Sequence, residues 1–210
     1  LERDWKSAQS YRPNPQRSSV GLTPQEVSRL LAAAEPGKAR MLLTTMYGCG
    51  LRVSEASALE VTDIDSQRMV IHIRNGKGRK DRYVPLGENL LEQLRDYWRT
   101  YKPSRFLFPG SRADKRWNPS GVRQEFRLAV RIAGIDKACT THTLRHSYAS
   151  HCLAAGVKIG TIQQILGHAN FETTAIYTHV TSDINGTEEP FPDLLAEDPH
   201  GDTGDQRSSP

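Results

Sequence analysis

The sequence predicts a mostly α-helical domain with one small β-hairpin. In several stretches between residues 22 and 180, apolar side chains recur every three or four positions, the spacing of helices that bury one face. Two short runs of β-forming residues, 69–73 and 81–85, flank a glycine-containing basic turn, which is typical of a hairpin. The length of 210 residues is enough to bury one such core without disulfide bonds.

The first helix has a clear start signal. Thr23 is a candidate N-cap, Pro24 stands at the first helical position, and Glu26 completes a capping box. The apolar stripe that follows runs to Ala34, where a Pro-Gly pair ends it. Further helices are expected at 38–47, 52–59, 87–101, from Asn118 or Ser120 to about 132, and at 140–155, 159–166 and 173–180, with a short extended piece at 106–110.

The two ends of the chain differ from this domain in composition. Residues 1–21 are polar and contain prolines and serines, so we expect a linker or truncated end. Residues 181–210 carry a net charge of −7 and are expected to form a mobile tail, whereas residues 1–180 carry +11. The overall charge of +4 therefore conceals a strongly basic body, which favours nucleic acid as a partner; a merely solvated basic face is the alternative.

Composition also excludes some classes of protein. A mean hydropathy of −0.59 and the lack of a long apolar run exclude a membrane span. Three cysteines, Cys49, Cys139 and Cys152, are an odd number without a C-x-x-C pair. They predict reduced thiols in a cytosolic protein rather than a disulfide framework.

The turn of the expected hairpin is strongly basic. Its nine residues, 74–82, include one acidic residue and five cations: Arg74, Lys77, Arg79, Lys80 and Arg82. Glycines on both sides of Lys77 let the backbone approach a partner closely, so the loop suits contact with phosphates. The spacing is not that of a P-loop. A solvated turn that prevents edge pairing is the alternative.

Two arginines are expected on helices. Arg52 opens a helix after the glycines at 48 and 50, where backbone N–H groups and a guanidinium together suit an anion. Glu55 lies three residues later on the same face and can orient that guanidinium, although a surface ion pair of this spacing contributes little. Arg145 shares the face of a later helix with His142.

The histidines do not predict a metal site. His142 and His146 have the i,i+4 spacing of zinc ligands, but no glutamate stands between them as in H-E-x-x-H, and the cysteines supply no matching ligands. We therefore expect no metal and no cofactor. His168 follows Gly167 at the expected end of a helix, and Tyr177 lies in the next helix; taken singly, each is more simply a packing residue.

Taken together, these residue types suit metal-free attack on a phosphodiester. Two guanidiniums can bind the non-bridging oxygens and stabilise charge in the transition state. A tyrosine can act as a covalent nucleophile, and a lysine or histidine can protonate the leaving 5′-oxygen. A covalent phosphotyrosine retains the energy of the broken bond, so the strand can be rejoined without ATP.

The ordered motifs resemble the catalytic domain of the tyrosine recombinases, the phage-integrase family that includes the Xer recombinases and Cre. They are GLRVSE at 50–55, GKGRKDR at 76–82, HTLRH at 142–146, LGH at 166–168 and YTH at 177–179, and the resemblance covers about residues 22–180. It implies that fold and site-specific recombination or integration of double-stranded DNA. It also implies a homo-oligomer, a tetramer on synapsed DNA, located in the bacterial cytoplasm at the nucleoid.

The resemblance further implies a role for each matched residue. The expected catalytic residues are Arg52, Lys77, His142, Arg145, His168 and Tyr177, with Glu55 in support. Beside them, the other cations of the basic turn are the expected DNA contacts: Arg74, Arg79, Lys80 and Arg82. Tyr177 is the nucleophile that forms a 3′-phosphotyrosyl link, Arg52 and Arg145 hold the scissile phosphate, and Lys77 is the general acid. The two histidines assist in proton transfer and phosphate binding.

Members of the family usually carry an N-terminal helical domain that completes a clamp around DNA. Only residues 1–21 precede the motif-bearing part here, so we expect them to be the linker or truncated end of such a domain. Two other functions stay open. Residues 147–167 have the helix–glycine–helix pattern of a helix-turn-helix binding module. A type IB topoisomerase that relaxes DNA would use the same tyrosine chemistry.

Overall fold

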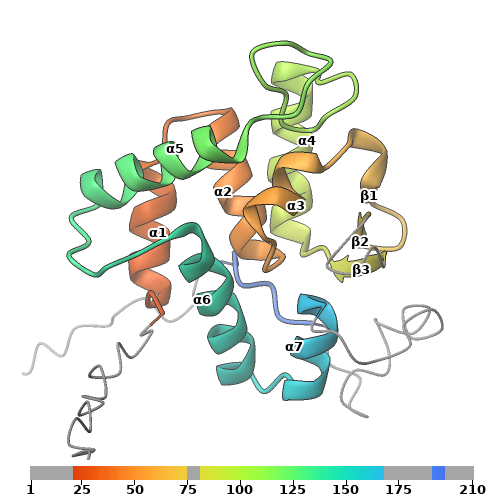
Figure 1. Ribbon diagram of the computed structural model, residues 1–210. Helices are drawn as coiled ribbons and strands as arrows, with labels where there is room; N and C mark the ends of the chain where they lie inside the picture. The colour runs from red at the N-terminus through yellow and green to blue at the C-terminus, as the bar shows by residue number, and fades with distance from the viewer. Residues whose placement is uncertain (1–20, 75–80, 168–190, 197–210) are drawn as a thin grey trace, which may run out of the picture.

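The computed structural model describes residues 21–74, 81–167 and 191–196 (Figure 1). In chain order its elements are α1 (Pro24–Ala33), α2 (Lys38–Gly48), α3 (Val53–Ala58), the 3₁₀ turn η1 (Val61–Asp63), β1 (Ile64–Asp65), β2 (Val70–Ile73), β3 (Arg82–Pro85), α4 (Glu88–Tyr101), α5 (Pro119–Ile132), α6 (Thr141–Ala154) and α7 (Ile159–Leu166). The predicted class, mostly helical with a small sheet, is therefore confirmed. The helix expected at 173–180 lies outside the described residues.

Side-chain caps fix the starts of two helices. The Thr23 hydroxyl accepts a hydrogen bond from the Glu26 N–H at 3.2 Å, and the Glu26 carboxylate accepts one from the Thr23 N–H at 2.8 Å, so the predicted capping box is present. At α5, the Asn118 side chain accepts from the Ser120 N–H at 2.9 Å. Asn118, rather than Ser120, is thus the residue that caps α5.

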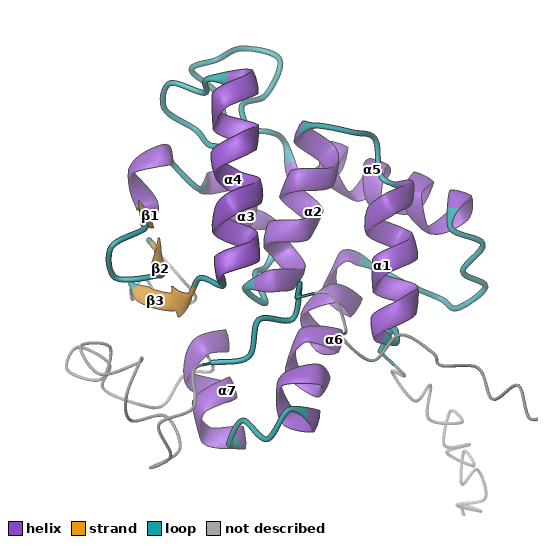
Figure 2. Cartoon of the chain, turned by 180° about the vertical axis from the view of Figure 1, so that it is seen from behind, coloured by secondary structure: helices purple, strands orange, loops and turns teal. Residues whose placement is uncertain are grey.

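The central helix of the domain is α2. It contacts α1, α3, α4, α5 and α6, and the views from both sides place it between the α1–α5 pair and α4 (Figure 1, Figure 2). Eight of its eleven residues are buried, so the helix has almost no polar face. The chain then turns at Gly50, whose φ of +60° suits glycine, and a Cβ there would lie 2.5 Å from the Tyr148 ring.

The three strands form one antiparallel sheet in the order β1-β2-β3. In the β2–β3 pair, Ile73 lies opposite Arg82 and His72 opposite Tyr83, which confirms the predicted hairpin. The two-residue strand β1 was not predicted, because two residues are too few for an alternating pattern. Along β3, Arg82 and Val84 are buried and Tyr83 is partly exposed, so the strand alternates between an inner and an outer face.

The last two described segments, α7 and residues 191–196, pack against the rest of the domain. Helix α7 contacts α6 and β3. Residues 191–196 run beside the start of α4, where the Asp193 carboxylate accepts a hydrogen bond from the Asn89 N–H at 2.9 Å. It thereby caps a helix whose own N-cap, Gly87, has no side chain. Leu194 and Leu195 pack against the core, so this part of the tail is docked, whereas we expected a mobile tail.

None of the helices in the described ranges is both long and apolar enough to cross a lipid bilayer.

Candidate active site

The first arginine of the expected site stands at the start of α3. Arg52 is its N-cap residue, and its Nη1 donates to Glu55 Oε1 at 2.8 Å. The backbone N–H of Arg52 donates to Glu55 Oε2, also at 2.8 Å. The Glu55 side chain is only 7% exposed, against 23% for Arg52. The expected i,i+3 contact is therefore present, but it is a largely buried pair rather than a surface one.

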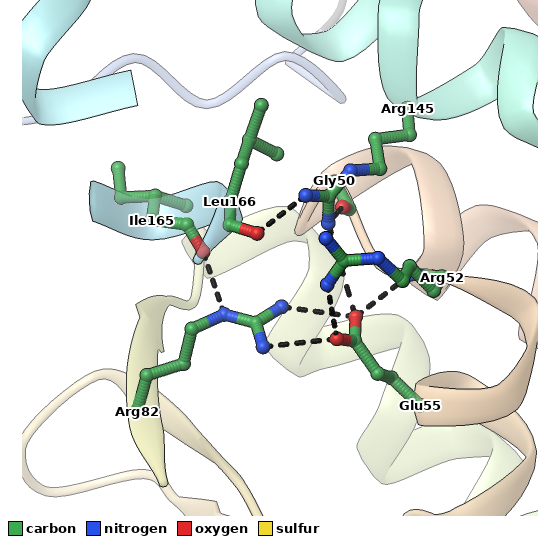
Figure 3. A network of polar contacts seen from close by, with 7 residues as sticks. All are labelled: Gly50, Arg52, Glu55, Arg82, Arg145, Ile165 and Leu166. Atoms are coloured by element: carbon green, nitrogen blue, oxygen red, sulfur yellow. Dashed lines mark hydrogen bonds and ion pairs between the residues drawn. The ribbon is translucent and has the colours of Figure 1, made fainter. Parts of the chain in front are cut away.

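A third residue, Arg82 of β3, also donates hydrogen bonds to this carboxylate (Figure 3). Its Nη1 and Nη2 donate to Glu55 Oε1 and Oε2, both at 2.9 Å, in the parallel geometry that matches a guanidinium to a carboxylate. Its Nε donates to the Ile165 carbonyl at the end of α7 at 2.7 Å. Arg82 was expected to contact DNA; the structure instead places it in the interior, 5% exposed.

The second arginine of the expected site, Arg145, comes from α6. It donates through Nη1 to the Gly50 carbonyl at 2.9 Å and through Nη2 to the Leu166 carbonyl, and its Nη1 lies 3.8 Å from Glu55 Oε2. Burial and the nearby charge of Arg52 lower the pKa of Arg145 to about 10, so it stays protonated at neutral pH. Arg52 and Arg145, 93 residues apart in the sequence, therefore meet beside one carboxylate (Figure 3).

Glu55 is ionised in this setting. Burial alone would raise its pKa, but the hydrogen bonds and charge of Arg82, followed by the hydrogen bonds from Arg52, outweigh burial and lower the pKa to about 2. The carboxylate is therefore a fixed negative charge that holds two guanidiniums in place.

His142 lies in the first turn of α6 and is exposed. Desolvation, together with the positive charges of His146, Arg145 and Arg52, lowers its pKa below the ordinary 6.5. The imidazole is accordingly neutral at pH 7, and one ring nitrogen is able to accept a proton. His142 and Arg145 both lie in α6, three positions apart, as the prediction of a shared helix face requires.

Arg74, another expected DNA contact, lies at the end of β2 and pairs with acidic groups. Its Nε is 2.7 Å from Asp63 Oδ1, its Nη1 donates to Glu60 Oε2 at 3.3 Å, and its Nη2 donates to Thr62 Oγ1 at 3.2 Å. The side chain is 43% exposed. Five more expected site residues, Lys77, Arg79, Lys80, His168 and Tyr177, lie outside the described residues.

Sequence reasoning missed the bridge made by Arg82. The alternation of side chains along β3 could have predicted its burial, because Arg82 lies on the same face of the strand as the apolar Val84. The backbone carbonyls of Gly50 and α7 that accept from Arg145 and Arg82 could not be predicted, because every residue type has a backbone carbonyl.

Sequence comparison matches the chain to integrases and recombinases. The profile of the phage integrase family matches residues 21–183. A Sinorhizobium fredii protein named as an integrase/recombinase is 45% identical over 91% of this chain and 63% of its own length. The tyrosine recombinase XerA of Pyrococcus horikoshii is 37% identical over 80% of this chain and 59% of its own. The chain thus spans about three fifths of the length of these curated relatives.

Solved structures agree with the sequence matches. A crystal structure of XerA recombinase superposes with a TM-score of 0.66 at 36% identity, covering 76% of this chain and 59% of that one. The pre-cleavage complex of the XerH site-specific recombinase with its difH substrate gives a TM-score of 0.60 at 25% identity, covering 77% and 50%. The arrangement of helices and sheet is therefore similar to that of tyrosine recombinase catalytic domains.

Proposed function

The chain belongs to the phage integrase family, and from this premise we propose that it breaks and rejoins double-stranded DNA at specific sites through a 3′-phosphotyrosyl intermediate. The observation that carries the proposal is the meeting of Arg52 and Arg145 at Glu55. Arg52 is held by the buried Glu55 carboxylate, and Arg145 is held by the Gly50 and Leu166 carbonyls. The two guanidiniums form a preorganised site for a phosphodiester, because their charge is already oriented before the anion arrives.

The proposed reaction exchanges one phosphodiester for another. The Tyr177 phenol loses its proton and its oxygen attacks the scissile phosphorus, while the bond to the 5′-oxygen breaks and that oxygen gains a proton. Lys77 is the proposed donor of this proton. In the second step a 5′-hydroxyl loses its proton and attacks the phosphotyrosine, the bond to the tyrosine oxygen breaks, and the Tyr177 phenol regains a proton. The proposed cycle therefore requires neither a metal nor a cofactor.

His142 and His168 are proposed to assist the proton transfers. The lowered pKa of His142 supports this role, because a neutral imidazole is able to accept the phenolic proton at pH 7. Arg52 and Arg145 are proposed to contact the non-bridging oxygens, where negative charge increases in the transition state.

The proposed partner is double-stranded DNA. The charge of +11 on residues 1–180 supports it, and the related XerH was solved with its difH substrate. Recombination of two duplexes breaks four strands, and each chain supplies one Tyr177, so we propose a homotetramer on synapsed DNA. The proposed site of action is the nucleoid of a bacterial cytoplasm, where such DNA is found.

A covalent trapping assay tests the proposal. The full chain is incubated with nicked duplexes that carry a randomised core, and DNA that stays attached in SDS is recovered and sequenced. We expect an adduct with the wild type and none with Tyr177→Phe, whereas Tyr101→Phe, which alters an exposed tyrosine of α4, should leave the adduct unchanged. An adduct that persists in Tyr177→Phe contradicts the nucleophile assignment.

Two further assays separate the competing functions. A DNA-binding module would bind duplex DNA but give no adduct with any sequence. A type IB topoisomerase would relax a supercoiled plasmid without joining two sites, whereas a recombinase should exchange strands between two copies of the selected site.

A further inference from the structure

Arg82 is the most deeply buried of the three arginines around Glu55. Each of its guanidinium nitrogens donates a hydrogen bond: Nε to the Ile165 carbonyl at 2.7 Å, and Nη1 and Nη2 to the two Glu55 oxygens at 2.9 Å. The side chain is also closely packed, since a Cβ on Gly167 would lie 3.2 Å from Arg82 Cδ. Every nitrogen of the Arg82 guanidinium thus already donates to a protein acceptor, and the side chain is only 5% exposed, so its role is within the protein.

The two acceptors of Arg82 are directly linked to the two arginines proposed to hold the phosphate. Glu55 accepts from both the side chain and the backbone of Arg52. Ile165 precedes Leu166, whose carbonyl accepts from Arg145. Thus the Arg82 side chain links α3 to the end of α7 (Figure 3). Arg52 donates to Glu55 of α3, and Arg145 donates to the Leu166 carbonyl at the end of α7.

We propose that Arg82 is a positioning residue for strand cleavage, which fixes the Glu55 carboxylate and the C-terminal end of α7 so that Arg52 and Arg145 face the scissile phosphate together. The inference rests on the proposed function. It does not assign Arg82 a contact with DNA, and it gives a physical reason for an arginine at this position in the β3 strand.

A lysine cannot replace this arrangement. The planar guanidinium reaches both carboxylate oxygens and a backbone carbonyl in three fixed directions, whereas an ammonium is a compact charge that cannot reproduce the parallel pair of hydrogen bonds. The variant Arg82→Lys therefore keeps the charge and loses the geometry. Arg82→Gln loses both.

The protonation state of Glu55 gives a readout that loss of packing alone would not move. The charged groups that face it are Arg52 on its own helix, Arg82 from β3 and Arg145 from α6, and the cavity beside it is also lined by Glu60, Asp63, Arg74 and Arg116. Helix α7 presents carbonyls and no charged side chain. With Arg82 removed, fewer hydrogen bonds and charges oppose the effect of burial, so the Glu55 pKa should rise.

The experiment measures single-turnover cleavage between pH 5 and 9 on the DNA selected by trapping. For Arg82→Gln at saturating DNA we expect the rate to fall about tenfold to a hundredfold with little change in DNA affinity, and an added loss of rate toward acid pH. Arg82→Lys should recover part of the rate and remove the acid loss. Arg99→Gln, which alters a pair with Asp96 whose side chains are 67% and 75% exposed, is the matched control and should behave as wild type.

A second measurement keeps the two proposals distinguishable. Carbon-13 NMR of labelled glutamate follows the Glu55 carboxyl through a pH titration and requires no DNA. If the wild type forms no adduct, the proposed function fails, yet a raised Glu55 pKa in Arg82→Gln would still support the positioning of Glu55. An unchanged Glu55 titration, or an Arg82→Gln rate and pH profile equal to those of the wild type, overturns the inference.

Discussion

The buried carboxylate of Glu55 makes a quantitative prediction about stability. Its pKa is about 2 in the folded protein and near the ordinary 4.5 in the unfolded chain, a difference worth about 3 kcal/mol. Because the folded value is the lower one, this stabilisation is present above about pH 4.5 and is lost as the pH falls toward 2. Of the total, about 2 kcal/mol should already be lost at pH 3.

Glu55→Gln isolates this contribution from all other titrating groups. Urea unfolding followed by circular dichroism gives the free energy of unfolding of both proteins at pH 7, 5, 4 and 3. At pH 7 the variant should be about 3 kcal/mol less stable, because Arg52 and Arg82 lose their counter-ion. The gap should narrow by about 2 kcal/mol at pH 3. A gap that is constant with pH would refute the linkage and show that the carboxylate contributes through shape alone.

Three further predictions follow from the described residues. Asp193→Ala should lower the free energy of unfolding by about 1 kcal/mol and speed amide exchange in the first turn of α4, because the carboxylate that caps this helix is removed. Gly50→Ala should cost more than 2 kcal/mol in chemical denaturation, since it combines a positive φ with a contact of 2.5 Å to Tyr148. Gly134→Ala, at a φ of +63° where an added Cβ would meet no atom of the described residues within 4 Å, is its control and should cost only about 1 kcal/mol. Proton NMR should place the His142 midpoint below 6.5 in low salt, and added sulfate should raise it, because an anion beside the arginines favours the imidazolium; a midpoint unmoved by sulfate would argue against an anion site there.

The helices and the hairpin were predictable because each has a local signal. The capping box at Thr23 and Glu26 is a pattern of four residues, and it forms as the sequence indicates. The contact between Arg52 and Glu55 is also local, since their spacing places both on one helix face. These features depend on neighbours in the chain, which the sequence lists directly.

The rest of the site depends on residues that are far apart in the sequence. Arg82 reaches Glu55 across 27 positions and Ile165 across 83, and no local pattern measures such distances. Its positive charge within a basic loop suggested a role at the surface. The burial of Arg82 reflects the alternation of β3 and the presence of an acidic partner in α3, two facts that combine only after the sheet and helices pack.

The charges around Glu55 do not cancel, because three arginines surround one carboxylate. Arg52, Arg82 and Arg145 carry three positive charges, against one carboxylate and the C-terminal end of α7, which contributes about half a negative charge. Because Arg82 satisfies both oxygens of Glu55, the more distant Arg145, at 3.8 Å, is not drawn into a tight pair with it. The surplus of more than one positive charge therefore lies with Arg52 and Arg145, and a phosphodiester, which carries one negative charge, matches it.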